Sequence, residues 1–231
     1  MHERESGYLT KQESISVRGA DRLLIRSLMN RQQYADPKGE AEAAGFSSAT
    51  WPLFGVLWPS GRQLAAHMAL RAMVAGERIL EVGCGLALAS LVCHRRGSDV
   101  TASDAHPLTE QFLFDNLALN DLPPLAYRHG DWASSDDMDR DDLHPSVLGR
   151  FDVIMGSDVL YERDDGGHLA GFIERHAQPC SEVLIVDPNR GNRSPFVRRM
   201  NGMGYELSET MLDTPEDDGL PYKGRLLHFS R

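Results

Sequence analysis

The sequence predicts an α/β fold, a doubly wound sheet of seven strands that is mainly parallel and carries one antiparallel strand in a C-terminal hairpin. Two observations predict it. From Arg78 onward, short apolar runs alternate with helical patterns of roughly 10 to 15 residues, which is typical of βαβ units with helices on both faces. The last two strand candidates have no helix between them, so one of them runs antiparallel.

The first half of the alternation begins with a strand over residues 78–82 that ends in glycines. A helix over 86–96 stops at Gly97, and a strand over 99–104 ends in an aspartate. The next helix, over 107–120, starts with Pro107, which suits a first helical turn because no intrahelical partner is lost there. A short strand over 125–129 completes this half.

The second half contains two buried strands, over 151–157 (FDVIMGS) and 181–188 (SEVLIVDP), whose near-continuous apolar character is typical of parallel sheets. Helices are predicted over 168–178 and 195–204. Strands over 205–212 and 224–230 flank a polar turn and form the closing hairpin. Together these elements predict a Rossmann-like domain.

The pattern before the first core strand is less regular. A helix is predicted over 62–75, after Ser60-Gly61, and residues 35–45 are turn-rich and then weakly helical. Residues 23–28 (LLIRSL) fit a strand or a short helix. We therefore divide the chain into an N-terminal extension, residues 1–50, and one domain, residues 51–231.

The composition excludes several classes of protein. The chain has 231 residues, 41% apolar and 25% charged, as in ordinary globular proteins. It has no apolar run near the roughly 20 residues that span a bilayer and no signal-peptide pattern. Three cysteines without a CxxC pair are typical of reduced thiols, which favours a cytoplasmic location. The nine histidines form no ligand pattern, so we expect no metal.

The net charge is −10, which disfavours nucleic-acid binding because that affinity depends on neutralising phosphates. Acidic residues are concentrated in residues 134–142 and 215–218. These stretches are either solvated loops or a surface that attracts a basic partner.

Ligands of open α/β sheets bind at the carboxyl ends of the strands. After the strand over 78–82, Gly83 and Gly85 allow a ligand to approach the backbone and the next helix N-terminus. A dinucleotide motif would have a third glycine where Leu88 stands, which argues against pyrophosphate. Asp104 follows the next strand, 21 residues after Gly83, where an acid accepts hydrogen bonds from ribose hydroxyls.

Asp131 follows the strand over 125–129, where its carboxylate could accept a hydrogen bond from an adenine amino group. Trp132 is available to stack on the base. Either residue alone would more often belong to a turn. Together with the glycines and Asp104, they predict an adenosine site without a pyrophosphate.

With these motifs the sequence resembles the class I S-adenosylmethionine-dependent methyltransferases, over residues 58 to 231. The resemblance rests on Glu81-Val82-Gly83-Cys84-Gly85, Asp104, Gly130-Asp131-Trp132 and the terminal strand pair. It implies S-adenosylmethionine as cofactor, with the glycine loop, including Glu81 and Cys84, at its methionine part. Asp104 would hold the ribose and Asp131 the adenine. Ala87 replaces the usual third glycine.

Other motifs resemble the seven-strand protein lysine methyltransferases. That branch shares a tryptophan segment before the first core helix, here with Trp58, and a D-x-x-Y/F motif, here Asp158 to Tyr161. The resemblance implies that Trp58 lies near the cofactor or the target side chain, and we expect it to contact the cofactor. Asp187-Pro188-Asn189-Arg190 looks similar to the sub-branch that modifies the electron-transfer flavoprotein β-subunit, with Asn189 where a glycine is expected. Arg190 would contact an acidic substrate or pair with Asp187.

The resemblance implies that Asp158 and Tyr161 form the acceptor side of the site and that Ser157 approaches the methyl group. A lysine amine, with a free pKa of about 10.4, must lose a proton before it attacks. We expect Asp158 to capture and orient the amine and Tyr161 to supply an aromatic wall. Otherwise Asp158 caps the following helix, Tyr161 packs in the core, and Trp58 is a packed corner.

A protein lysine substrate is the function that we expect, with the small-molecule N- or O-methyltransferases as the enzyme alternative. A cofactor-binding module without turnover is the alternative of another class. A nucleic-acid methyltransferase is disfavoured because residues 158–161 lack the prolines of its motif. A nicotinamide-dependent oxidoreductase is disfavoured by Leu88.

Overall fold

The computed structural model describes residues 7–133, 145–213 and 222–231. The acidic stretches of residues 134–142 and 215–218 therefore lie outside the described residues, and both interpretations of them stay predictions. The described residues form one seven-stranded sheet and one two-stranded hairpin.

The large sheet has the strand order β5-β4-β3-β6-β7-β9-β8. Neighbours from β5 to β7 pair in parallel, while β9 runs antiparallel to both β7 and β8. The strands are β3 (Arg78–Val82), β4 (Asp99–Asp104), β5 (Ala126–His129), β6 (Phe151–Ser157), β7 (Ala177–Asp187), β8 (Glu206–Leu212) and β9 (Gly224–Ser230). The predicted fold class is confirmed, including its single antiparallel strand. The order reverses between β3 and β6, so a crevice opens there at the carboxyl ends.

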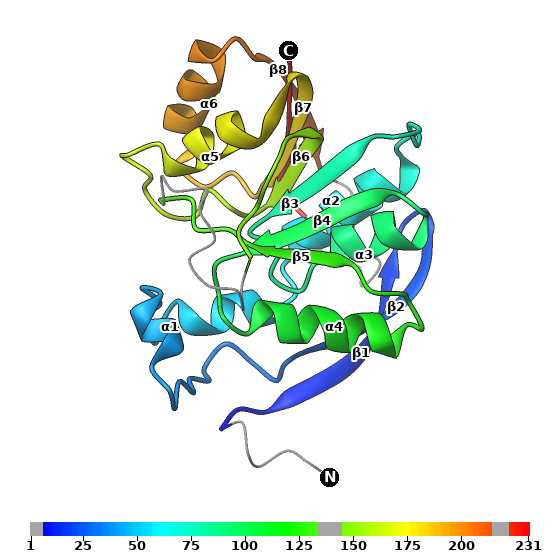
Figure 1. Cartoon of the computed structure of the whole chain (residues 1–231), viewed down its shortest axis with the longest axis vertical. Coiled ribbons are helices and arrows are strands. Elements are labelled where there is room, and N and C mark those ends of the chain that lie inside the picture. The colour runs from blue at the N-terminus through cyan, green and yellow to red at the C-terminus, as the bar shows by residue number, and fades with distance from the viewer. Residues whose placement is uncertain (1–6, 134–144, 214–221) are drawn as a thin grey trace.

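Helices cover both faces of this sheet, as Figure 1 shows, with α5 and α6 on one side and α4 on the other. The elements outside the sheets are α1 (Glu40–Ala43), η1 (Trp51–Gly55), α2 (Pro59–Leu70), α3 (Leu88–Arg95), α4 (Thr109–Leu119), α5 (His168–His176) and α6 (Arg193–Gly202).

Strand residues alternate between two buried clusters because successive side chains point to opposite faces. Ile79 and Val153 belong to the cluster with α2, α3 and α4, whereas Leu80 and Ile154 belong to the cluster with α5 and α6. Each strand is therefore apolar on both faces, which is why the sequence shows continuous apolar runs.

An N-terminal hairpin of β1 (Thr10–Val17) and β2 (Ala20–Leu28) packs on α4. The free edge of β2 is held by two side-chain amides of that helix. Asn116 accepts from the N–H of Arg26 at 2.7 Å and donates to its carbonyl at 3.3 Å. Asn120 makes the same pair of bonds to Leu24, at 2.8 and 2.7 Å. The two amides thus replace a third strand and satisfy backbone groups that would otherwise lack partners.

The sequence left residues 23–28 open between strand and helix, and they form part of β2. The helix expected over 62–75 begins earlier, because Pro59 occupies its first turn, and ends at Leu70. Apolar residues of the hairpin share the core cluster of α2 to α4. The division of the chain at residue 50 stays a prediction.

Candidate functional site

A cavity of about 560 Å³ opens at the carboxyl ends of β3, β4, β5 and β6. Its wall includes all eleven residues that the sequence predicts for the site: Trp58, Glu81, Gly83, Cys84, Gly85, Asp104, Asp131, Trp132, Ser157, Asp158 and Tyr161. The structure thus brings the whole predicted set together. The role of each residue in binding or catalysis stays a prediction.

The loop after β3 is built around left-handed backbone. Gly83 has φ 59° and Gly85 has φ 50°, a region that side chains disfavour. A Cβ on Gly85 would also lie 2.9 Å from the carbonyl oxygen of Phe54, and one on Gly83 would lie 3.0 Å from Val159. The glycines are therefore required by close neighbours as well as by conformation, and they leave the backbone open to the cavity.

Ala87 stands where the related motif has its third glycine, and it is left-handed too, with φ 55°. It is the residue before α3, whose first N–H groups have no intrahelical partner. This conformation costs a non-glycine residue about 1 kcal/mol or more. Ala87 thus adopts the left-handed conformation that a glycine would take without this cost.

Asp104 connects the end of β4 to the glycine loop. Its carboxylate accepts hydrogen bonds from the N–H groups of Gly85 and His106, each at 2.9 Å. Burial raises the pKa of Asp104, and these backbone bonds oppose that rise. Each carboxylate oxygen has a further lone pair, so Asp104 can still accept from a ligand hydroxyl.

Glu81 is buried beneath the same loop and uses one oxygen to hold the start of α3. Its Oε2 accepts from the Ser90 N–H at 2.8 Å and the Ser90 hydroxyl at 2.5 Å. Burial raises the pKa of Glu81 to about 7. Burial also raises the pKa of the neighbouring Cys84 thiol, which disfavours the reactive thiolate.

Asp131 and Trp132 follow β5. The Asp131 carboxylate accepts from the Ala133 N–H at 2.9 Å, which fixes the turn. The Trp132 ring lies against the glycine loop, since a Cβ on Gly83 would lie 3.3 Å from it. Within the described residues the Trp132 indole N–H is buried without a hydrogen-bond partner. The Trp132 side chain also lines the cavity.

Asp158 directly follows β6 and has a left-handed conformation, with φ 57°. Its N–H still donates to the Val186 carbonyl of β7 at 2.9 Å, so the strand pairing continues up to this residue. Burial raises the pKa of Asp158, and the guanidinium of Arg190 opposes that rise. Arg190 donates to Asp158 Oδ2 at 3.2 Å, while Oδ1 is buried and has no partner among the described residues.

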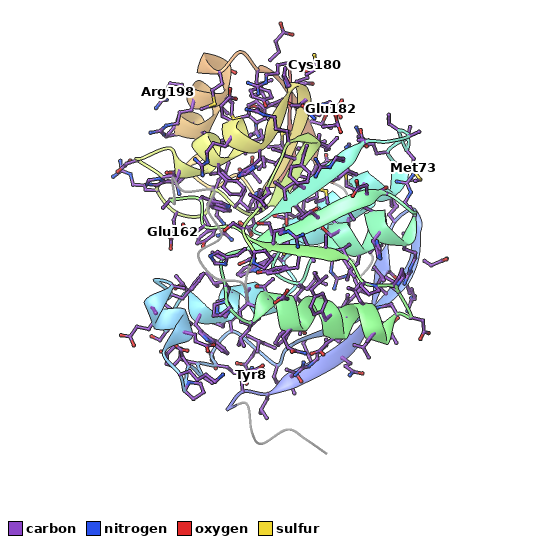
Figure 2. The ribbon with its side chains drawn as sticks, in the orientation of Figure 1. Tyr8, Met73, Glu162, Cys180, Glu182 and Arg198 are labelled. Atoms are coloured by element: carbon purple, nitrogen blue, oxygen red, sulfur yellow. The ribbon has the colours of Figure 1, made fainter. Side chains whose placement is uncertain are left out.

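Two aromatic side chains, Trp58 and Tyr161, line the same cavity as Asp158. The Trp58 indole N–H donates to the Leu53 carbonyl at 2.9 Å, and the Arg190 guanidinium carbon lies 5.8 Å from its ring centroid. Tyr161 is 39% exposed, and burial of its hydroxyl raises its pKa to about 12. The hydroxyl is therefore protonated at neutral pH. Figure 2 shows Glu162, the next residue along the chain, at the outer edge of this loop.

The turn after β7 explains the asparagine found in place of an expected glycine. Asn189 has φ 64°, and asparagine is one of the few residues that tolerates this region. Its N–H donates to Asp187 Oδ2 at 2.9 Å. Asp187 thus stabilises the turn, and the backbone N–H of Arg190 also hydrogen-bonds to it. The guanidinium of Arg190 forms its ion pair with Asp158.

A family model described as lysine methyltransferase matches residues 53–202. The chain belongs to the lysine methyltransferase family. The match starts within η1 and ends with α6, so it includes every strand end that forms the cavity. The predicted resemblance to a class I methyltransferase is confirmed.

Two curated relatives of this family member carry lysine methyltransferase names. The electron transfer flavoprotein beta subunit lysine methyltransferase of Xenopus laevis is 26% identical over 69% of this chain and 63% of its own length. Protein N-lysine methyltransferase METTL21A of Mus musculus is 26% identical over 74% of this chain and 76% of its own length. The chain thus covers less than two thirds of the first of these relatives.

The fold of this lysine methyltransferase family member also occurs in magnesium protoporphyrin IX methyltransferase from Synechocystis, solved with bound S-adenosylmethionine. That structure matches with a TM-score of 0.55 and 14% identity, over 74% of this chain and 77% of the other. At this identity the likeness supports the fold alone.

The cavity residues of this family member fit S-adenosylmethionine. The wall combines carboxylates that can accept from hydroxyl and amino groups, the Trp132 ring and glycines that expose the backbone. Apolar and aromatic side chains fill the space between these polar groups, as is usual for small-molecule sites. Within residues 7–133, 145–213 and 222–231, no cluster of histidine, cysteine and acidic side chains could hold a metal, and no helix could cross a membrane.

Sequence reasoning missed His106 and Phe54, which also line the cavity. Their rings stack with centroids 3.9 Å apart, and burial lowers the pKa of His106 to about 3. The Leu108 N–H donates to His106 Nδ1 at 3.2 Å, so the neutral ring carries its proton on Nε2. The sequence places His106 two residues after Asp104, and that proximity is the signal that could have indicated it.

Proposed function

We propose that the chain is an S-adenosylmethionine-dependent methyltransferase that methylates a lysine side chain of a protein. One observation carries the proposal: Asp158 and Tyr161 share a cavity with the glycine loop and Asp104. A carboxylate and an aromatic ring suited to an amine therefore lie in the same space as groups suited to an adenosine ligand. The family match and the lysine methyltransferase names of the relatives support this function.

S-adenosylmethionine, when bound, supplies a methyl group activated on a sulfonium. Asp104 would accept hydrogen bonds from the ribose, and Asp131 with Trp132 would hold the adenine. Gly83 and Gly85 would contact the methionine part, with Glu81 and Cys84 supporting the loop from below. These groups hold their positions through backbone hydrogen bonds, so most of the rate gain would come from alignment of the acceptor.

On the acceptor side Asp158 would bind the incoming ammonium and orient its nitrogen. Tyr161 and Trp58 would form aromatic walls, and cation–π attraction to such rings is worth about 0.5–2 kcal/mol. Ser157, the last residue of β6, would approach the methyl group. The amine then loses its proton to water, because a nitrogen without a lone pair cannot attack.

The acidic character of the chain favours a protein acceptor with a basic surface. The net charge is −10, and Glu162, Asp164 and Asp165 line the same cavity. Asp164 also caps α5 by accepting from the N–H groups of His168 and Leu169. A cytoplasmic location belongs to the same proposal, and the unpaired thiols of Cys84, Cys93 and Cys180 support it.

The test is to incubate the protein with S-adenosylmethionine labelled in its methyl group and a cell extract. We expect label in protein bands, recovered as methylated lysine after hydrolysis. Asp104→Ala should abolish it, while Asp99→Ala, at the exposed start of the same strand, should not. Label found only in small molecules would contradict a protein acceptor.

A further inference from the structure

Arg190 is the feature of the acceptor side that the proposed function does not use. Its guanidinium occupies the carboxylate that an incoming ammonium requires, since Nη2 lies 3.2 Å from Asp158 Oδ2. The Asp158 side chain is only 9% exposed, whereas that of Arg190 is 42% exposed. The cation therefore reaches inward from the surface to a carboxylate in the cavity wall.

The contact of Arg190 with Asp158 is weaker than the contact of Arg71 with Glu77. Arg71 binds Glu77 through two nitrogens, at 2.6 and 2.7 Å, in the paired geometry that makes such contacts strong. Arg190 uses one nitrogen at the longer distance. A partly exposed, single contact of this kind is readily exchanged for another cation.

The Trp58 ring offers the Arg190 guanidinium an alternative binding position. Its carbon is already 5.8 Å from the Trp58 ring centroid, within the range of cation–π attraction. The backbone that carries Arg190 is anchored, because Asn189 Oδ1 accepts from Arg225 Nε at 2.6 Å. Exchange therefore requires movement of one side chain and leaves the turn in place.

We propose that Arg190 is a built-in competitor for the substrate cation: it occupies Asp158 while the acceptor side is empty and moves away when a lysine ammonium enters. This inference rests on the proposed function for the identity of the amine. Two cations on one carboxylate repel each other, so entry of the ammonium weakens the Arg190 contact. Arg190 thereby sets the affinity for the acceptor, and weakly bound cations are rejected.

The experiment measures amine binding without methyl transfer. The protein is loaded with S-adenosylhomocysteine, which has no methyl group to give, and titrated with n-butylammonium, which carries the amine of a lysine side chain. NMR follows the Arg190 Nε–H signal in the unsubstituted chain and backbone amides near Asp158 in every variant. We expect the Arg190 signal to shift as the amine saturates its site.

The variants distinguish an Arg190 that competes with the amine for Asp158 from an Arg190 that helps to bind the amine. Arg190→Gln should tighten amine binding by about two- to fivefold, the range expected for loss of an exposed ion pair. Arg190→Lys retains a competing cation and should bind close to the unsubstituted value. Arg193→Gln, which removes a nearby arginine that contacts Glu209 instead, should change nothing.

Three results would overturn the proposal: weaker or unchanged binding in Arg190→Gln, equal tightening in Arg190→Lys and Arg190→Gln, or an Arg190 signal that stays still while the amine binds. Failure of the proposed function is seen separately, as absence of label in protein in the methyl-transfer experiment. Since the titration involves no transfer, the two failures are distinguishable.

Discussion

The Asp104 carboxylate and the Gly85 N–H are joined by a hydrogen bond of 2.9 Å. This bond connects the end of β4 with the loop after β3, and the pairing of the two strands holds both ends in register. A group suited to a ribose and a loop suited to the rest of the cofactor therefore have a fixed relative position before any ligand binds.

Asp104→Asn should weaken binding of S-adenosylhomocysteine by about 10- to 100-fold, because hydrogen bonds to a charged group are worth about 1.5–3 kcal/mol. Isothermal titration calorimetry measures the effect. Asp99→Asn, a charge loss at the other end of β4, serves as the control and should bind normally. Equal affinities for the two variants would remove Asp104 from the site.

Gly85→Ala should destabilise the fold more than Gly97→Ala does. Both glycines have positive φ, so both variants incur the left-handed cost of about 1–2 kcal/mol. A Cβ on Gly97 meets nothing within 4 Å, whereas one on Gly85 lies 2.9 Å from the Phe54 carbonyl oxygen and adds about 1–3 kcal/mol of overpacking. Urea unfolding compares the two variants, and equal losses would show that the loop relaxes freely.

Asp158→Asn should separate catalysis from cofactor binding. Asparagine tolerates the left-handed φ of this position, so the end of β6 keeps its shape while the negative charge is lost. We expect turnover on the labelled protein substrate to fall by about 10-fold or more, as for loss of a charged contact of roughly 1.4 kcal/mol or more. Affinity for S-adenosylhomocysteine should stay unchanged, and unchanged turnover would contradict the role proposed for Asp158.

Glu81 should make the free energy of unfolding depend on pH. Folded Glu81 keeps its proton up to about pH 7, whereas the unfolded chain releases it near the ordinary pKa of 4.5. The folded state therefore binds more protons between these values, and stability falls as the pH rises through the window, by about 3 kcal/mol in total. Urea unfolding of the unsubstituted chain and Glu81→Gln at both ends of the window measures the difference. An identical pH dependence in both would contradict this assignment.

Asn116→Ala should release one point of attachment of β2. Its amide is fully buried and makes two bonds to the Arg26 backbone, so truncation leaves buried polar groups without partners, at about 1–3 kcal/mol. Hydrogen exchange at the Arg26 amide should accelerate relative to amides of β3. Gln111→Ala, an exposed change on the same helix, is the control. Unchanged exchange in Asn116→Ala would show that apolar packing alone holds the hairpin.

The core sheet and the set of cavity residues could be predicted from the sequence because local patterns determine them. Apolar runs such as residues 151–157 are followed directly by glycine or aspartate, and parallel strands bring such ends to one edge. The helix over 62–75 was misplaced because its apolar spacing continues past Leu70, although the chain turns away at Arg71.

The remaining features depend on contacts between distant residues. The β1 sequence is largely polar, so its pairing with β2 leaves little periodic signal. The Arg190–Asp158 contact joins residues 32 positions apart, whereas the sequence indicates an acidic substrate or Asp187 as the partner of Arg190. The left-handed backbone conformations could not be predicted either. They occur at Asp158, Ala87 and Asn189, residue types that usually adopt right-handed or extended conformations.

The distance between the two asparagines along α4 matches the distance between their two partner residues along β2. Asn116 and Asn120 are four positions apart, about 6 Å along a helix, and their partners Arg26 and Leu24 are two apart, about 6.6 Å along a strand. Asparagines at positions i and i+4 of a helix can therefore each hydrogen-bond to the backbone of alternate residues in an extended segment. Asn-x-x-x-Asn on a covering helix is therefore a search pattern for other chains in which the free edge of a β-hairpin docks on a helix.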